Sequence, residues 1–120
     1  MNAFEPRSCA CRSGCEPEAR RFFGELLGLA EIAKPESLQS RGGVWFDVGA
    51  QQLHIGVAEP FSPALKAHPA FRVRDEAIEG LATRLVDAGE VVEWDESIAS
   101  VRRFYTVDPW GNRIEILASS

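Results

Sequence analysis

Hydrophobic residues recur along this chain with two different periods. Two segments have the spacing of an amphipathic helix. The first starts at Pro17, which suits a first helical position, and stops at Gly28. The second starts at Asp75, a favourable N-cap, and stops at Gly89. The predicted apolar stripes are Ala19, Phe22, Phe23, Leu26 and Leu27 in the first helix, and Ile78, Leu81, Ala82 and Leu85 in the second.

The remaining apolar positions lie in short segments, several of which alternate with polar residues as half-buried strands do. We predict strands over residues 30–33, 44–48, 52–57, 70–74, 91–94, 102–107 and 113–117, with loops over 35–43 and 59–67. Residues 5–12 are a poorer candidate for a first strand. With that strand included, the order strand, helix, strand, strand, strand occurs twice.

The end of the chain contains the most informative motif. Pro109 presets φ for a turn, and Gly111 supplies the positive φ that a hairpin exit requires. After this turn the side chains alternate, so that Glu115 points away from Ile114 and Ile116. A glutamate in the middle of a strand is disfavoured unless its side chain faces solvent or its carboxylate has a functional role. Glu115 therefore lies on an exposed face, or it is a ligand or a base in a cavity.

The spacing of the two units supports a structural repeat. His54 follows Gly28 by 26 residues, and Glu115 follows Gly89 by the same number. His54 and Glu115 therefore occupy equivalent places on the last strand of each unit. The predicted fold class is α+β, built from two βαβββ modules that form a cupped mixed sheet with helices on the outer face.

The composition narrows the range of partners. A chain of 120 residues with 26% charged and 45% hydrophobic residues is expected to form one domain. The net charge of -5 without a basic patch excludes nucleic acid, and the absence of an 18-residue apolar run excludes a membrane span. No apolar signal segment opens the chain, so we expect a cytoplasmic protein that binds a small molecule.

Three cysteines, Cys9, Cys11 and Cys15, lie near the start of the chain. An odd count without an export signal argues against a disulfide framework. The spacing C-x-C-x3-C lacks a fourth ligand nearby, so it is a weak zinc signal. We interpret these residues as small buried or half-buried side chains in or near a strand; a redox or metal role is the alternative.

The only two histidines and one glutamate could together carry chemistry. Strand parity places His54, His68 and Glu115 away from the apolar faces. Two imidazoles and a carboxylate suffice for zinc, nickel, manganese or ferrous iron, and a small donor set leaves positions open for a substrate. The simpler alternative is that the histidines are solvated on a polar strand face.

Other side chains are candidates for binding the substrate. Arg72, Arg103 and Arg113 could bind an anionic group, although surface arginines are commoner than anion sites. The candidate aromatic walls of a cleft are Trp45, Phe104, Tyr105 and Trp110. The acidic residues Asp75, Glu76, Asp95 and Glu96 are most simply helix caps and solvated loop charges.

These motifs together resemble the vicinal oxygen chelate superfamily, which includes glyoxalase I, bleomycin-resistance proteins, fosfomycin-modifying enzymes and extradiol dioxygenases. The resemblance covers residues 17–118 and rests on 19–24, 27–29, 45–49, 52–57, 68–71 and the closing Asp-Pro-Trp-Gly-Asn-Arg-Ile-Glu at 108–115. It implies one domain with module one over about 4–58 and module two over about 68–118. It also implies a homodimer whose modules form a cupped sheet around each site.

The resemblance assigns metal ligands to the first and last strand of each module. His54, His68 and Glu115 match three of these positions. The fourth falls on Glu5, Pro6 or Arg7, of which only Glu5 is a usual ligand. The missing first-strand histidine weakens the dioxygenase and fosfomycin alternatives, and the site could form within one chain or across the dimer.

Three hypotheses about function follow. The first is a metal-dependent lyase or isomerase of the glyoxalase type, acting on a substrate with neighbouring oxygens, with Glu115 or Glu5 as the base. The second is a metal-free binding protein, like the bleomycin-resistance branch, that sequesters a drug or metabolite. The third is a plain scaffold with an empty cleft.

Overall fold

The computed structural model describes residues 7–58, 61–63 and 68–119. Module one contains β1 (Arg7–Cys11), α1 (Glu16–Ala19) with a π-helical continuation (Arg20–Leu26), β2 (Ala30–Ile32), a 3-10 helix (Glu36–Arg41), β3 (Val44–Val48) and β4 (Gln51–Val57). Its four strands form a mixed sheet in the order β1-β4-β3-β2. Only the β1–β4 pair is parallel.

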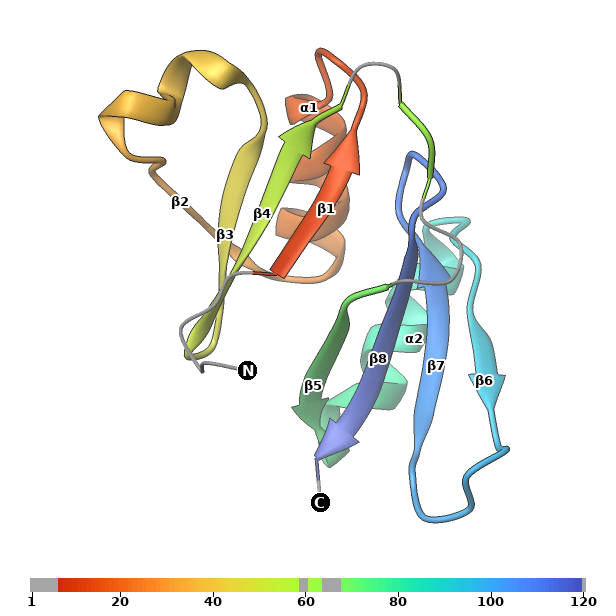
Figure 1. Ribbon diagram of the computed structural model, residues 1–120. Helices are drawn as coiled ribbons and strands as arrows, with labels where there is room; N and C mark the ends of the chain where they lie inside the picture. The colour runs from red at the N-terminus through yellow and green to blue at the C-terminus, as the bar shows by residue number, and fades with distance from the viewer. Residues whose placement is uncertain (1–6, 59–60, 64–67, 120) are drawn as a thin grey trace.

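Module two repeats this arrangement. It contains β5 (Ala70–Arg74), a 3-10 turn (Asp75–Ala77), α2 (Ile78–Asp87), β6 (Glu93–Asp95), β7 (Arg103–Val107) and β8 (Arg113–Ser119). The sheet order is β5-β8-β7-β6, again with a single parallel pair at one edge. The predicted repeat of βαβββ units is therefore confirmed, and each helix covers one face of its own sheet (Figure 1).

The two helices end where the sequence predicts. Gly28 and Gly89 follow the last helical residues with φ of +76° and +85°, a conformation that L side chains rarely adopt. The start of α2 differs from the prediction. Asp75 lies in the 3-10 turn before the helix, and the N-cap residue is Ala77, which makes no side-chain capping bond. Asp75 pairs instead with Arg102, at 3.4 Å, so the prediction that it caps the helix is wrong.

The core lies between each helix and its sheet. In module one it is aromatic: Phe23 of the helix meets Phe46 of β3, and Phe22 packs edge-on against Phe23. In module two Ile114 and Ile116 of β8 pack with the buried Phe104 of β7. Phe104 has 0% of its surface exposed, so the prediction that it forms a cleft wall is wrong.

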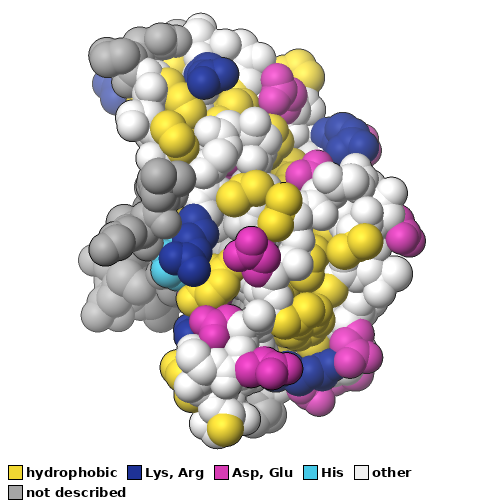
Figure 2. All heavy atoms as spheres, turned by 90° about the vertical axis from the view of Figure 1, so that its right-hand side faces the viewer, with side chains coloured by type: hydrophobic (Ala, Val, Ile, Leu, Met, Phe, Trp, Pro, Cys, Tyr) yellow, Lys and Arg dark blue, Asp and Glu magenta, His cyan; other side chains and the backbone are white. Residues whose placement is uncertain are grey.

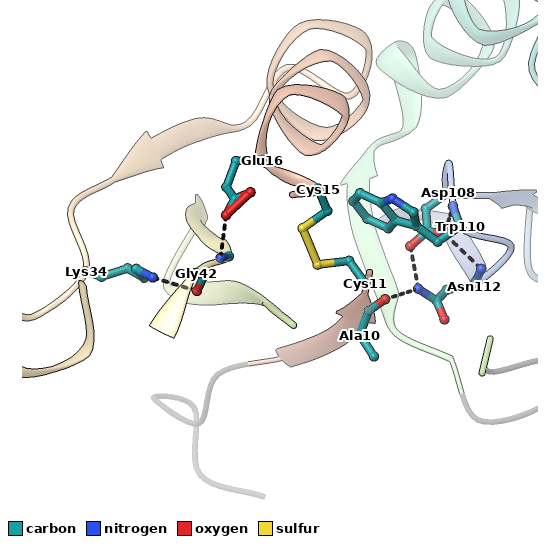
Figure 3. The surroundings of a disulfide bond; sticks show 10 residues. Ala10, Cys11, Cys15, Glu16, Lys34, Gly42, Asp108, Trp110 and Asn112 are labelled. Atoms are coloured by element: carbon teal, nitrogen blue, oxygen red, sulfur yellow. Dashed lines mark hydrogen bonds between the residues drawn. A yellow bond between two sulfur atoms is a disulfide. The ribbon is translucent and has the colours of Figure 1, made fainter. Parts of the chain in front are cut away.

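The turn between β7 and β8 joins module two to module one. The Asn112 side chain donates a hydrogen bond to the Ala10 carbonyl oxygen at 2.6 Å (Figure 3). The Trp110 ring stacks on Phe23, with ring centres 6.4 Å apart. Asp108 accepts hydrogen bonds from the backbone N–H groups of Trp110 and Asn112, while its burial raises the pKa of its carboxyl group. Trp110 is therefore a junction residue, and the prediction that it walls a cleft is also wrong.

The outer surface around α2 and β6 carries hydrophobic side chains between acidic and basic ones (Figure 2). Val86, Val91, Trp94 and Ile98 are its large exposed hydrophobic residues. Arg102 lies over the Trp94 ring at 5.7 Å, which covers part of that apolar surface. Among the described residues, no helix is long and apolar enough to cross a membrane.

All three cysteines are buried, as predicted, but two of them are bonded. Cys11 at the end of β1 and Cys15 just before α1 form a disulfide, with Cα atoms 6.2 Å apart (Figure 3). The sequence argument against a disulfide framework did not anticipate this bond. The connection between β1 and the helix returns the chain on itself and brings the two side chains together. Cys9 is a free thiol whose pKa burial raises to about 12.

Replacing both Cys11 and Cys15 with serine is expected to lower the free energy of unfolding by about 2 kcal/mol, since the bond closes a short loop in the unfolded chain. Urea denaturation of the oxidised protein and the double variant measures this difference. A Cys9→Ala variant is the control, because it leaves the bond intact. Equal stabilities for the oxidised protein and the double variant would contradict the stabilising role.

Candidate functional site

The site is built on the face of module two that points away from α2. Along β8, Ile114 and Ile116 enter the core, so the alternation sends Glu115 to the opposite face. The register places Glu115 beside Tyr105 of β7 and Ala70 of β5. Glu115 is only 8% exposed. The alternative that Glu115 lies on an exposed sheet face is therefore wrong.

Two side chains contact the Glu115 carboxylate, one at each oxygen. His68 Nε2 lies 2.9 Å from Glu115 Oε1, and Arg103 Nη1 lies 3.4 Å from Oε2. The Arg103 guanidinium also donates to Asp95 Oδ2 at 3.0 Å. These groups form one row across the sheet, from Asp95 on β6 to His68, which lies two residues before the start of β5. A carboxylate with a partner on each oxygen is held in a fixed orientation.

The aromatic ring of Tyr105 packs against the side chains of this row. Its ring meets His68 edge-on at 5.5 Å, and the Arg113 guanidinium lies over it at 3.8 Å from the ring centre. Arg103 is 5.5 Å from the same ring. Four of the predicted site residues of module two, Glu115, Tyr105, Arg103 and Arg113, are thus brought together with His68.

Asp95 is the residue of this cluster that the sequence argument missed. It was expected to be a cap or a solvated loop charge, and the ion pair with Arg103 corrects this. Hydrogen bonds from Ser97 and the nearby Arg103 hold the pKa of Asp95 below its usual value. The signal that could have found it is strand parity on β6, but a strand of three residues gives parity little support in sequence.

In module one, His54 occupies the position that corresponds to Glu115 in module two. Register places His54 between Ser8 of β1 and Trp45 of β3, as Glu115 lies between Ala70 and Tyr105. The rings of His54 and Trp45 are stacked, with centres 3.5 Å apart and planes inclined by 5°. His54 Nε2 is also 3.0 Å from the side-chain oxygen of Gln52.

Burial lowers the pKa of His54, because removing water penalises the charged imidazolium. In metal-free protein we expect its NMR titration midpoint below the ordinary value of 6.5. Trp45→Ala removes the ring that covers His54, and this change is expected to return the midpoint towards 6.5. A His54 midpoint that is the same in both proteins would contradict the assignment.

The predicted metal ligands are brought together only in part. His68 and Glu115 have donor atoms 2.9 Å apart, and two ligands on one ion with bonds of about 2.1 Å are separated by roughly 3 Å. These two side chains therefore fit a shared divalent ion. Within the described residues, however, no group of three His, Cys, Asp or Glu side chains could hold a metal, so His54 does not join them in one chain.

The fourth predicted ligand position falls at the start of β1, and two of its three candidates, Glu5 and Pro6, lie outside the described residues. Ser8 pairs with His54 as Ala70 pairs with Glu115. His68 precedes Ala70 by two positions, and the residue that precedes Ser8 by two positions in the sequence is Pro6. Proline has no side-chain donor for a metal. The alternative ligand, Glu5, lies outside the described residues.

Arg72 completes the predicted set. It is exposed on β5 and lines a cavity together with Glu115 and Leu117. This cavity lies between β5, β8 and the turn that joins β3 to β4. Trp45, in contrast, lies on module one, stacked on His54.

The fold is shared with solved structures. Over its whole length the chain matches the crystal structure of a protein from Bacillus anthracis assigned to the glyoxalase family, at 44% identity and a TM-score of 0.93, with 97% of that chain covered. Our chain belongs to the glyoxalase family. The resemblance to the vicinal oxygen chelate superfamily and the predicted fold class are thereby confirmed.

Two more distant structures share the fold of this glyoxalase-family protein. Lactoylglutathione lyase from Agrobacterium tumefaciens is 20% identical with a TM-score of 0.70, over 96% of our chain and 93% of that one. A FosX variant from Listeria monocytogenes, in complex with Mn(II) and 1S,2S-dihydroxypropylphosphonic acid, is 15% identical with a TM-score of 0.79, over 100% and 94%. No protein-family model and no curated protein matches the chain.

Proposed function

We propose that this protein is a divalent-metal-dependent enzyme that carries out glyoxalase-like lyase or isomerase chemistry on a small substrate with neighbouring oxygens. In this proposal the protein is a homodimer, and each site combines His68 and Glu115 of one chain with His54 of the partner subunit. Zinc, nickel, manganese or ferrous iron suits two imidazoles and one carboxylate.

The observation that carries the proposal is the 2.9 Å separation of His68 Nε2 and Glu115 Oε1 on a largely buried sheet face. A bound ion would act as a Lewis acid that stabilises negative charge on a substrate oxygen. In this proposal Glu115 is the carboxylate that accepts a proton from the substrate. Tyr105 and Trp45 would wall the site, and the arginines of β5, β7 and β8 would attract an anionic group.

Two solved structures with the same fold support the proposed metal dependence and the proposed class of substrate. The FosX complex holds Mn(II) together with a molecule that carries two neighbouring hydroxyl groups. The lactoylglutathione lyase carries a lyase activity on the same fold. The open edges of β1 and β5 in the two sheets support a dimer, because unpaired strand edges favour association with another chain.

A subunit-mixing experiment tests the shared site. His54→Ala and His68→Ala proteins are each titrated calorimetrically with Zn²⁺ or Ni²⁺, and the same is done after they are unfolded and refolded together. Neither variant alone should bind an ion tightly. Random mixing should restore about one intact site for every four chains, because one of the two sites in each mixed dimer keeps all three ligands.

The controls separate the parts of this proposal. The unmodified protein should bind about one ion per chain, and light scattering should give the mass of a dimer. Unmodified protein that binds no ion overturns the metal-dependent function. Tight binding by the unmodified protein without restoration in the mixture overturns the shared site alone.

A metal-free binding protein is the second candidate, and one observation favours it. Both carboxylate oxygens of Glu115 already have partners in His68 and Arg103, which offset its charge without an ion. In that case the aromatic side chains and the arginines would hold the ligand by themselves. Unmodified protein that binds no ion would favour this candidate.

A further inference from the structure

A cavity of about 440 Å³ opens beside Glu115 within a single chain. Its lining combines both modules, since Val48, Ala50 and Gln51 come from module one and Ala70, Phe71, Arg72, Glu115 and Leu117 from module two. The volume is within the range of small-molecule sites. Apolar groups form most of the lining, while the carboxylate of Glu115, the amide of Gln51 and the guanidinium of Arg72 supply the polar contacts.

Arg72 differs from the other arginines of this sheet in its partners. Arg103 is engaged by Asp95 and Glu115, and Arg113 is stacked on Tyr105. Arg72 makes no ion pair with any side chain in the described part of the protein, and its register partner on β8 is the apolar Leu117. Neither Arg103 nor Arg113 lines the cavity. Among the described residues, the positive charge available to a molecule in this cavity is therefore that of Arg72.

We propose that this cavity binds an anionic molecule with a small apolar body, and that Arg72 binds its anionic group. The apolar body lies against Leu117, Ala70 and the β3–β4 turn, and the oxygens next to the anionic group face Glu115. A guanidinium can make two parallel hydrogen bonds to a carboxylate, so Arg72 would select anions over neutral analogues of the same shape. The assignment of the oxygens that face Glu115 rests on the proposed function; the anion-binding role of Arg72 does not.

Two probes that share one carbon skeleton, one with an anionic carboxylate and one with a neutral hydroxymethyl group, test this proposal. Mandelate carries a carboxylate, a neighbouring hydroxyl and an apolar ring, and 1-phenylethane-1,2-diol has the same skeleton without the charge. Each is titrated into metal-free full-length protein and followed by amide NMR shifts. We expect mandelate to bind more tightly than the diol and to shift the amides of Gln51, Ala70 and Leu117. Arg72→Gln should weaken mandelate binding roughly ten-fold and leave diol binding unchanged.

A matched control removes the same charge from the same strand. Arg74 lies two residues further along β5 and does not line the cavity, so Arg74→Gln should change mandelate binding less than two-fold. Equal mandelate affinities in the unmodified protein and Arg72→Gln overturn the proposal, as does a failure of mandelate to bind or shifts outside the cavity. Zn²⁺ titration of the same proteins reports separately on the proposed function. If the protein binds Zn²⁺ but shows no Arg72-dependent mandelate binding, only this inference is refuted. If mandelate binding depends on Arg72 but Zn²⁺ does not bind, only the proposed metal dependence is refuted.

Discussion

Replacing Gly43 with alanine is expected to lower the free energy of unfolding by more than about 4 kcal/mol. Gly43 has φ of +87°, a conformation that costs an L residue roughly 1–2 kcal/mol. A Cβ added there would also lie 2.1 Å from the carbonyl oxygen of Ile55 on β4. That oxygen belongs to the backbone, so relief of the overlap requires β3 and β4 to separate beside His54 and Trp45.

Gly49→Ala is the matched control for Gly43→Ala. Gly49 also has a positive φ, of +59°, but nothing lies within 4 Å of an added Cβ. This variant should therefore lose only roughly 1 kcal/mol. Urea denaturation followed by circular dichroism measures both changes. If the two variants lose the same amount of stability, the close approach of Gly43 to β4 does not constrain the fold.

Replacing Glu115 with glutamine is expected to weaken the binding of Zn²⁺ or Ni²⁺ at least about 100-fold, because it removes the anionic donor from the proposed ligand set. The amide keeps the shape of the side chain and one oxygen that can accept a hydrogen bond from Arg103. Calorimetric titration of the full-length protein measures the affinity, and thermal unfolding measured alongside it shows whether the variant remains folded.

Glu93→Gln is the control for this substitution. Glu93 is an exposed residue of β6 whose register partner is Tyr105, so Tyr105 lies between Glu93 and Glu115 in the sheet. Glu93 is not part of the proposed ligand set. Its replacement removes the same charge from the same sheet and should leave metal affinity within about two-fold. Unchanged metal affinity in folded Glu115→Gln protein would show that Glu115 is not a ligand.

Local physics explains which parts of the fold could be predicted from the sequence. The strands over 44–48 and 70–74 agree with the prediction at both ends, and the helices stop at Gly28 and Gly89. Alternation, helical spacing and positive φ are properties of neighbouring residues, so a sequence pattern reports them directly. The same parity placed Glu115 on the face away from the core, and the repeat made it the counterpart of His54.

Parity gives the face of a side chain but not its neighbours on that face. His68 and Glu115 lie 47 residues apart, and only the parallel pairing of β5 with β8 brings them within 2.9 Å. The pairing of β3 with β4 instead stacks His54 on Trp45, away from the other two predicted ligands. These pairings depend on hydrogen bonds between distant segments, which no local pattern encodes.

Tertiary packing, within module two and between the modules, decided the roles of several other residues. Phe104 and Trp110 are aromatic residues of the kind that line clefts. Phe104 is instead buried in the core of module two, and Trp110 packs against Phe23 of module one. Asp95 became a partner of Arg103 because the short strand β6 pairs with β7. The sequence by itself thus determined the elements, the repeat and the chemistry available on each face. The tertiary structure decided which of those side chains meet, because contact depends on register and packing between segments far apart in the chain.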